Sequence, residues 1–228
     1  MKYISRLFIG MLALIYIAFL IWFGGSSQPM SVEEVASRLA RINELSVSSN
    51  ALGSEIGLDD LRALCAGDDG GEFFMVNLIK YRDKAMYPQG MNKEMGDDPM
   101  AANNRYGRTI LPYLIKNGSF PVYMSNVSGR LIHPDRALDW DAVGIVRYRS
   151  RRDFLNMIEQ ILKSTSPVMV HKWASVERTQ VFPTSTALPW NSSSFVKIVV
   201  FALLVAFATI AIYSIRLIRC YVRRSQKK

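Results

Sequence analysis

The sequence is poor in the residues that build disulfide frameworks and metal centres. It has 2 cysteines and 2 histidines among 228 residues. One pair of cysteines cannot form a disulfide framework, and Cys65 and Cys220 fall in regions expected on opposite sides of a membrane, so we predict that they stay unpaired. His133 and His171 would need carboxylate partners to hold zinc, and no suitable spacing of carboxylates is visible. We therefore predict no metal site.

Catalytic motifs are missing as well. The chain contains neither a glycine-rich phosphate loop nor a nucleophile motif. The motifs therefore do not indicate a particular reaction, and we predict no catalytic residue.

Acidic residues are missing from both ends of the chain. None occurs before Glu33 or after Glu177, whereas the middle carries as many acidic as basic side chains. The net charge of +9 and the pI of about 9.7 therefore arise from the ends. A basic folded face would indicate nucleic-acid binding, but these basic residues flank apolar segments, which is typical of membrane proteins. We predict no nucleic-acid partner.

Two apolar runs stand beside these basic residues. Leu7–Phe23 is uncharged and would cover roughly 26 Å as a helix, close to the thickness of a hydrocarbon core. It is longer than the apolar stretch of a signal peptide and lacks an A-x-A cleavage pattern, which favours a retained anchor over a cleaved leader. Ile198–Ile215 is also uncharged. We therefore predict two transmembrane helices in a lipid bilayer.

The basic residues lie on the terminal side of each apolar run. Lys2 and Arg6 precede the first run, and the arginines and lysines of residues 216–228 follow the second. By the positive-inside rule, both termini should face the cytoplasm. The middle of the chain is then periplasmic or in an equivalent extracytoplasmic space, and the expected location is the inner (cytoplasmic) membrane.

The stretch Trp140–Leu162 reads as a strand followed at once by an amphipathic helix. Alternate residues of 140–148 fall on opposite faces of the strand. Ser150 is placed to cap the helix, and Asp153 lies in its first turn, where the helix dipole favours an anion. Apolar residues then recur at the spacing of a core-facing helix, namely Phe154, Met157, Ile158, Ile161 and Leu162.

Similar patterns predict the other elements of the middle region. Ser31 and Glu34 have the spacing of a capping box, which opens a helix up to about residue 45. Further helices are expected at 58–66, 100–117 and 168–175, and strands at 72–81, 120–132 and 177–182. Residues 46–57, 82–99 and 133–139 are expected to be loops or turns.

These elements predict an α+β chain flanked by two transmembrane helices. The order strand, helix, strand, strand, helix, strand is the split β-α-β arrangement of ferredoxin-like folds. The expected segments are a first transmembrane helix (1–25, apolar over about 7–23), a helical extension (26–71), the ferredoxin-like domain (72–184), a linker (185–194), a second transmembrane helix (195–215) and a basic cytoplasmic tail (216–228).

Short motifs of the middle region resemble those of a known family. The motifs are Asn77-Leu78-Ile79-Lys80-Tyr81 with Tyr87, Tyr106-Gly107, Gly118, Trp140-Asp141, Arg147-Tyr148-Arg149-Ser150-Arg151 and His171-Lys172. Over about residues 72–184 they are similar to a group of small dimeric α/β-barrel domains known as a domain of unknown function. The resemblance implies a homodimer formed through the sheet face. A partner subunit is the alternative cover for that face, because its apolar rows must be buried.

The chain departs from the family pattern at several points. The family usually has proline where this chain has Arg149, a second glycine where it has Ser119, and arginine where it has Lys172. Its members are soluble and lack both apolar runs and the helices before Glu72. A soluble enzymatic role is therefore not carried over to this chain.

Polar residues near the sheet are candidates for ligand binding. Arg147 shares a strand face with Val143 and Ile145, which makes it the best candidate for a polar ligand contact. Asp141 is either a general base in a pocket or the partner of a nearby arginine, Arg147 or Arg149.

Aromatic and imidazole side chains complete the candidate set. Tyr81, Tyr106 and Tyr148 either line a pocket for a flat ligand or pack in the core. The resemblance extends to a superfamily with heme-binding relatives, so His171 is either an axial heme ligand or a hydrogen-bonded structural histidine. No cofactor is predicted, with heme, quinone or pigment kept as alternatives. The candidate ligand-binding residues are Asn77, Tyr81, Tyr106, Asp141, Arg147, Tyr148 and His171.

Two classes of function remain. In the first, the chain is a non-catalytic accessory or structural subunit of a larger membrane-protein complex, and its extracytoplasmic domain caps or clamps partners. Ala202, Ala206 and Thr209 share one face of the second span and would allow close contact with other integral membrane subunits. In the second, the domain binds or transforms a small apolar molecule in the manner of barrel monooxygenases. We favour the first.

Overall fold

The computed structural model describes residues 2–25, 28–49, 57–129, 131–132, 139–186 and 193–225. The chain divides into two compact units, one formed by Gly25–Ser185 and the other by Met1–Gly24 together with Thr186–Lys228. We refer to them as the larger unit and the terminal unit. Most of the predicted turn at 133–139, including His133, and most of the predicted linker at 185–194 lie outside the described residues.

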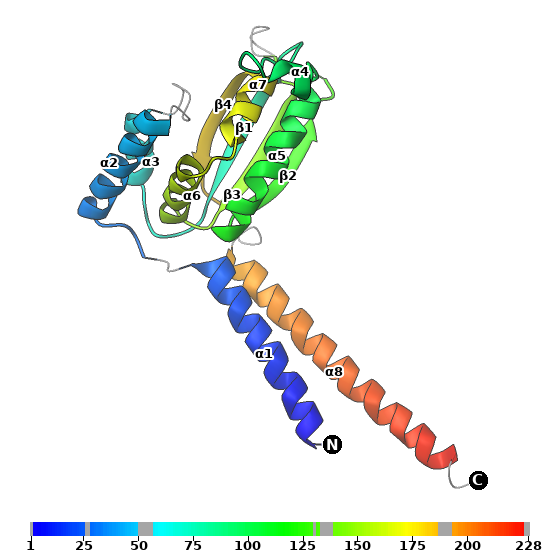
Figure 1. Ribbon diagram of the computed structural model, residues 1–228. Helices are drawn as coiled ribbons and strands as arrows, with labels where there is room; N and C mark the ends of the chain where they lie inside the picture. The colour runs from blue at the N-terminus through cyan, green and yellow to red at the C-terminus, as the bar shows by residue number, and fades with distance from the viewer. Residues whose placement is uncertain are drawn as a thin grey trace. The chain divides into compact units, whose positions relative to one another are not determined.

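A four-stranded antiparallel sheet is the centre of the larger unit (Figure 1). Its strands are β1 (Phe73–Tyr81), β2 (Phe120–Asn126), β3 (Ala142–Tyr148) and β4 (Val176–Thr184), in the order β2-β3-β1-β4. Every neighbouring pair is antiparallel. Consequently β1 and β2 run parallel with β3 between them, and β3 and β4 run parallel with β1 between them.

Helices α5 (Pro99–Lys116), α6 (Arg151–Lys163) and α7 (Val168–Ser175) cover one face of this sheet (Figure 1). The predicted cap of α6 is confirmed, because Ser150 Oγ accepts a hydrogen bond from Asp153 N at 3.1 Å. Gly118, which follows α5, has a φ of +66°, a left-handed conformation that favours glycine. Within the loop between β1 and α5, predicted to be irregular, the short helix α4 (Asn92–Met95) forms.

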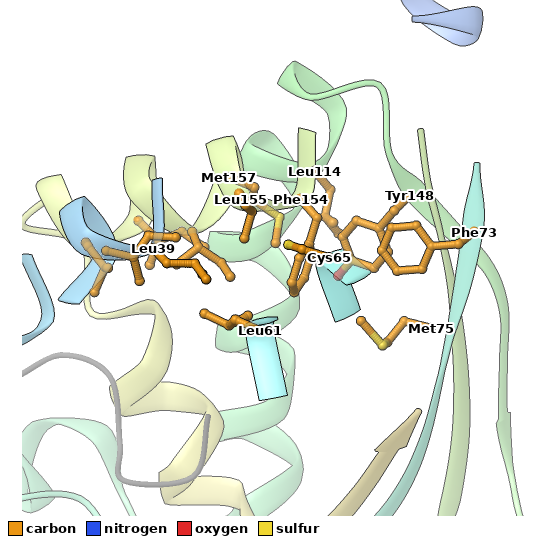
Figure 2. Close-up of a cluster of buried hydrophobic side chains, with 14 of the residues drawn as sticks. Leu39, Leu61, Cys65, Phe73, Met75, Leu114, Tyr148, Phe154, Leu155 and Met157 are labelled. Atoms are coloured by element: carbon orange, nitrogen blue, oxygen red, sulfur yellow. The ribbon is translucent and has the colours of Figure 1, made fainter. Parts of the chain in front are cut away.

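Two helices of the N-terminal extension pack onto the same core. They are α2 (Val32–Ser49), which contacts α6, and α3 (Leu58–Ala66), which has the predicted bounds. The capping box at the start of α2 is confirmed on one side, since Glu34 N donates to Ser31 Oγ at 3.2 Å. Figure 2 shows side chains of α2, α3, α5, α6 and the sheet in one apolar cluster, among them Leu39, Leu61, Cys65, Phe73, Leu114, Tyr148 and Leu155. Cys65 is buried there as a free thiol, as predicted.

Polar contacts fix the extension and the chain just before it. Arg152 of α6 forms an ion pair with Glu34 at 2.8 Å and donates to the backbone carbonyls of Gln28 and Pro29. Glu34 in turn pairs with Arg38 at 3.0 Å, and these arginines lower the pKa of Glu34 to about 2. The extension is therefore bound to α6 by charged pairs as well as by apolar packing.

The terminal unit consists of two long apolar helices packed together, α1 (Lys2–Gly24) and α8 (Ser193–Ser225). Tyr16 of α1 lies 5.4 Å from Phe201 of α8 between ring centroids, and its hydroxyl donates to the carbonyl of Lys197 at 3.1 Å. Residues 6–24 and 194–218 are long and apolar enough to cross a membrane, a criterion of length and composition alone. Helix α8 continues to Ser225, beyond the predicted end at residue 215, because the tail has no glycine or proline to stop it.

Candidate functional site

The two faces of the sheet have different surroundings. On the helix-covered face, Tyr148 stacks on Phe73 with ring centroids 5.3 Å apart and meets the edge of Phe154. The register places Phe74 opposite Arg147, and these two residues point to the other face. The two faces predicted for β3 from residue alternation are therefore confirmed.

Apolar rows line the face that no described helix covers. We call this surface the open sheet face. Tyr123 on β2 and Phe182 on β4 are 52% and 38% exposed. The surface consists of Phe74, Val76 and Leu78 of β1, Phe120 and Tyr123 of β2, Val143 and Ile145 of β3, and Phe182 of β4.

Arg147 is bound within the chain at the edge of this surface. It is only 3% exposed. Its Nε donates to Glu72 Oε2 at 2.6 Å, and Nη1 donates to the carbonyl of Gly118 at 3.1 Å. Burial lowers the pKa of Arg147, and the contact with Glu72 opposes this shift. Arg147 therefore ties the turn after α5 to β3 and to the residue before β1.

Asp141 joins the opposite end of β3 to β1. Its two carboxylate oxygens accept from Lys80 Nζ and from the backbone N–H of Tyr81, each at 2.8 Å. The predicted pairing with an arginine is therefore wrong. Arg147 lies at the other end of the strand, and Arg149 forms its ion pair with Asp153 of α6 at 2.7 Å.

Asn77 and the predicted tyrosines do not form one polar cluster. The Asn77 amide donates to the carbonyls of Met75 and Gly144 at 3.1 and 3.4 Å. Burial raises the pKa of Tyr106 to about 12, and burial together with Tyr106 raises the pKa of Tyr148. Burial and then Asp141 raise the pKa of Tyr81. Within the described part of the chain, the hydroxyls of Tyr106 and Tyr148 make no hydrogen bond.

His171 belongs to a separate cluster formed by α7, α5 and the loop before α5. Its Nδ1 lies 3.0 Å from the Tyr87 hydroxyl, and Arg105 Nη1 donates to the same hydroxyl at 3.4 Å. Burial and Arg105 lower the pKa of His171. Tyr87 is part of a sequence motif, but nothing in the sequence relates Arg105 to residue 171. Among the described residues, no group of three His, Cys, Asp or Glu side chains is placed to hold a metal ion.

The comparisons with known proteins give a structural likeness and no family. No family model and no curated protein matches the chain. Among solved structures, it is similar to RPA0582, a protein of unknown function from Rhodopseudomonas palustris, and to the methylated RPA0582 protein. Each is 26% identical and covers 61% of this chain and 98% of its own length, with TM-scores of 0.47 for RPA0582 and 0.49 for the methylated protein.

Proposed function

We propose that this chain is a membrane-anchored, non-catalytic accessory or structural subunit of a larger membrane-protein complex. The observation that carries the proposal is the pair of long apolar helices, α1 and α8, at the two ends of a folded α+β unit. Both helices expose large apolar side chains around most of their circumference, as expected in contact with lipid or other apolar helices. The bilayer and other integral membrane subunits are then the partners of the terminal unit.

Contacts between the two helices support a fixed two-span anchor. The ammonium of Lys197 lies beside the carboxyl end of α1, where a Cβ added to Gly24 would be 3.1 Å from Nζ. A cation is favourable at this position because the helix dipole places partial negative charge there. The small residues Ala202, Ala206 and Thr209 are exposed on α8, on the side left free by α1, and are available to a further membrane helix.

In the proposed topology, both termini are cytoplasmic and the larger unit is extracytoplasmic at the inner membrane. Protease added outside sealed cells is then expected to digest the larger unit, while a reporter fused after Lys228 stays protected. Replacing Arg216, Arg219, Arg223 and Arg224 together by Glu should weaken or invert insertion of α8, because cytoplasmic flanks retain basic residues. A larger unit that survives while both termini are digested would show the reverse orientation.

We assign the larger unit to the ferredoxin-like class and propose that its open sheet face is the docking surface. The strand order β2-β3-β1-β4 with helices in both parallel crossovers is that of a split β-α-β fold. Apolar rows exposed on one face of a sheet indicate an interaction site. The occupant is either a second copy of the sheet or the surface of a partner subunit.

Co-purification tests this docking surface. A glutamate placed in the apolar row by Val76→Glu is expected to release stoichiometric partners when the full chain is purified in mild detergent. Val47→Glu is the matched control, because Val47 is 80% exposed on α2, outside the open sheet face. Partners lost from both variants, or from neither, would place the docking surface elsewhere.

A second candidate function is the binding of a small apolar molecule, with monooxygenase-like chemistry as its enzymatic form. The observation that favours it is the aromatic pair of Tyr106 and Tyr148, which lie close enough that Tyr106 adds to the raised pKa of Tyr148. Aromatic rings of this kind can line a pocket for a flat ligand. An isolated homodimer that purifies with bound ligand or colour would favour this function over the subunit role.

A further inference from the structure

The side chains of Tyr87, Arg105 and His171 meet where the 82–98 loop, α5 and α7 pack together. The Tyr87 and His171 rings are perpendicular, with centroids 5.7 Å apart, and both residues are buried. Their surroundings are apolar and include Ala85, Ala102 and Ala174, with Met91 and Met95 packed alongside. We call these three residues the Tyr87–Arg105–His171 cluster.

Hydrogen-bond chemistry determines what this cluster can offer to a ligand. A guanidinium only donates, so the Tyr87 oxygen accepts from Arg105. In the tautomer in which the Tyr87 hydroxyl donates to His171 Nδ1, the ring proton of the neutral imidazole is on Nε2. The groups left over are donors: the remaining N–H groups of Arg105 and the Nε2–H of His171.

These donors have no acceptor within the described part of the chain. Arg105 forms no ion pair there, and its side chain makes no hydrogen bond except the one to Tyr87. In the same described part of the chain, the His171 side chain makes its hydrogen bond through Nδ1, to Tyr87. Two acidic residues of the loop that carries Tyr87 have other partners: Asp97 pairs with Lys84 at 3.7 Å, and Asp98 accepts from the N–H of Met100 at 2.8 Å.

We propose that the Tyr87–Arg105–His171 cluster binds the oxyanion group, carboxylate or phosphate, of a small molecule. A group that only accepts hydrogen bonds matches a set of donors, and the guanidinium fork fits two oxygens of one such group. Arg105 and His171 Nε2 contact the oxyanion, while Tyr87 positions the imidazole. This site is separate from the open sheet face and does not depend on the membrane role.

The charges around His171 predict that binding takes up a proton. Among the described residues, Arg105 of α5 is the charged group that acts on His171, and Tyr87 of the loop is its hydrogen-bond partner. Burial and the Arg105 charge favour the neutral ring in the free protein. A bound anion would offset both effects and raise the pKa of His171. Binding should therefore strengthen as the pH falls from 7.5 to 6.

The 2 histidines of the chain make the test selective. The full-length protein is produced with isotope-labelled histidine, placed in nanodiscs, and titrated at fixed ionic strength with inorganic phosphate, with acetate or with chloride. The two imidazole signals are assigned through His133→Gln. We expect phosphate or acetate to shift the His171 signal saturably and to raise its pKa, with no matching change at His133.

Arginine variants separate binding from general screening by salt. Arg105→Gln should weaken binding at least about tenfold through loss of charge-assisted hydrogen bonds. Arg108→Gln should leave binding unchanged, because Arg108 is exposed on the same helix and outside the cluster. A response to only one of the two oxyanions supports the site and identifies its group. An equal response to chloride, or an unchanged response in Arg105→Gln, would overturn the proposal.

Discussion

Replacing Arg147 by alanine is expected to lower the free energy of unfolding of the larger unit by about 3–5 kcal/mol. The substitution removes the ion pair between Arg147 Nε and Glu72 Oε2, which are 2.6 Å apart. The Glu72 side chain is only 13% exposed, so its charge lies mostly out of water. The substitution also removes the donor to the Gly118 carbonyl. The measurement is urea unfolding of the full-length chain in detergent, followed by tryptophan fluorescence.

A paired substitution distinguishes a broken ion pair from lost packing. Arg147→Met combined with Glu72→Gln removes both charges. It keeps an unbranched apolar side chain over Phe120, whose ring centroid lies 5.5 Å from Cζ of Arg147. This double variant should lose clearly less stability than Arg147→Ala, because it removes both charges of the ion pair together. Equal losses would mean that packing, and not the broken ion pair, sets the cost.

The position of Arg147 shows what the sequence could and could not predict about the site. Alternation along β3 correctly placed it on the face shared with Val143 and Ile145. Its partners Glu72 and Gly118 come from segments far away in the chain, and no local pattern relates them to residue 147. A strand face is a local property, whereas a hydrogen-bond partner depends on tertiary packing.

The same distinction applies to the fold. Helix α3 has its predicted bounds and α6 has its predicted cap, because both follow from local spacing and capping chemistry. Strand β2 ends at Asn126 although its apolar pattern continues to Ile132. The N–H of Val127 donates to the carbonyl of Asp141, the residue just before β3 begins. The end of β2 therefore coincides with the start of β3, the strand with which it pairs. The end of a strand depends on its neighbour, which the sequence pattern does not identify.

Ile42→Ala is the second substitution expected to have a large effect, a loss of about 2–5 kcal/mol in the free energy of unfolding. Ile42 lies on α2 and is 0% exposed, within the cluster that includes Leu155 of α6 and Phe73 of β1. The extension is thus part of the core. Chemical unfolding of the full-length chain measures the loss, and Val47→Ala on the exposed side of the same helix should change stability by no more than about 0.5 kcal/mol.

A double-mutant cycle then shows whether α2 and α6 share one packed interior. Leu155 is also fully buried, so Leu155→Ala alone should cost an amount similar to that of Ile42→Ala. If the two side chains belong to one cooperative core, the double variant should depart from the sum of the single losses by at least about 0.5 kcal/mol. Additive losses, together with a small effect of Ile42→Ala, would instead mean that α2 rests on a domain that is stable without it. In that case the charged pairs between Arg152, Glu34 and Arg38 would be what holds the extension in place.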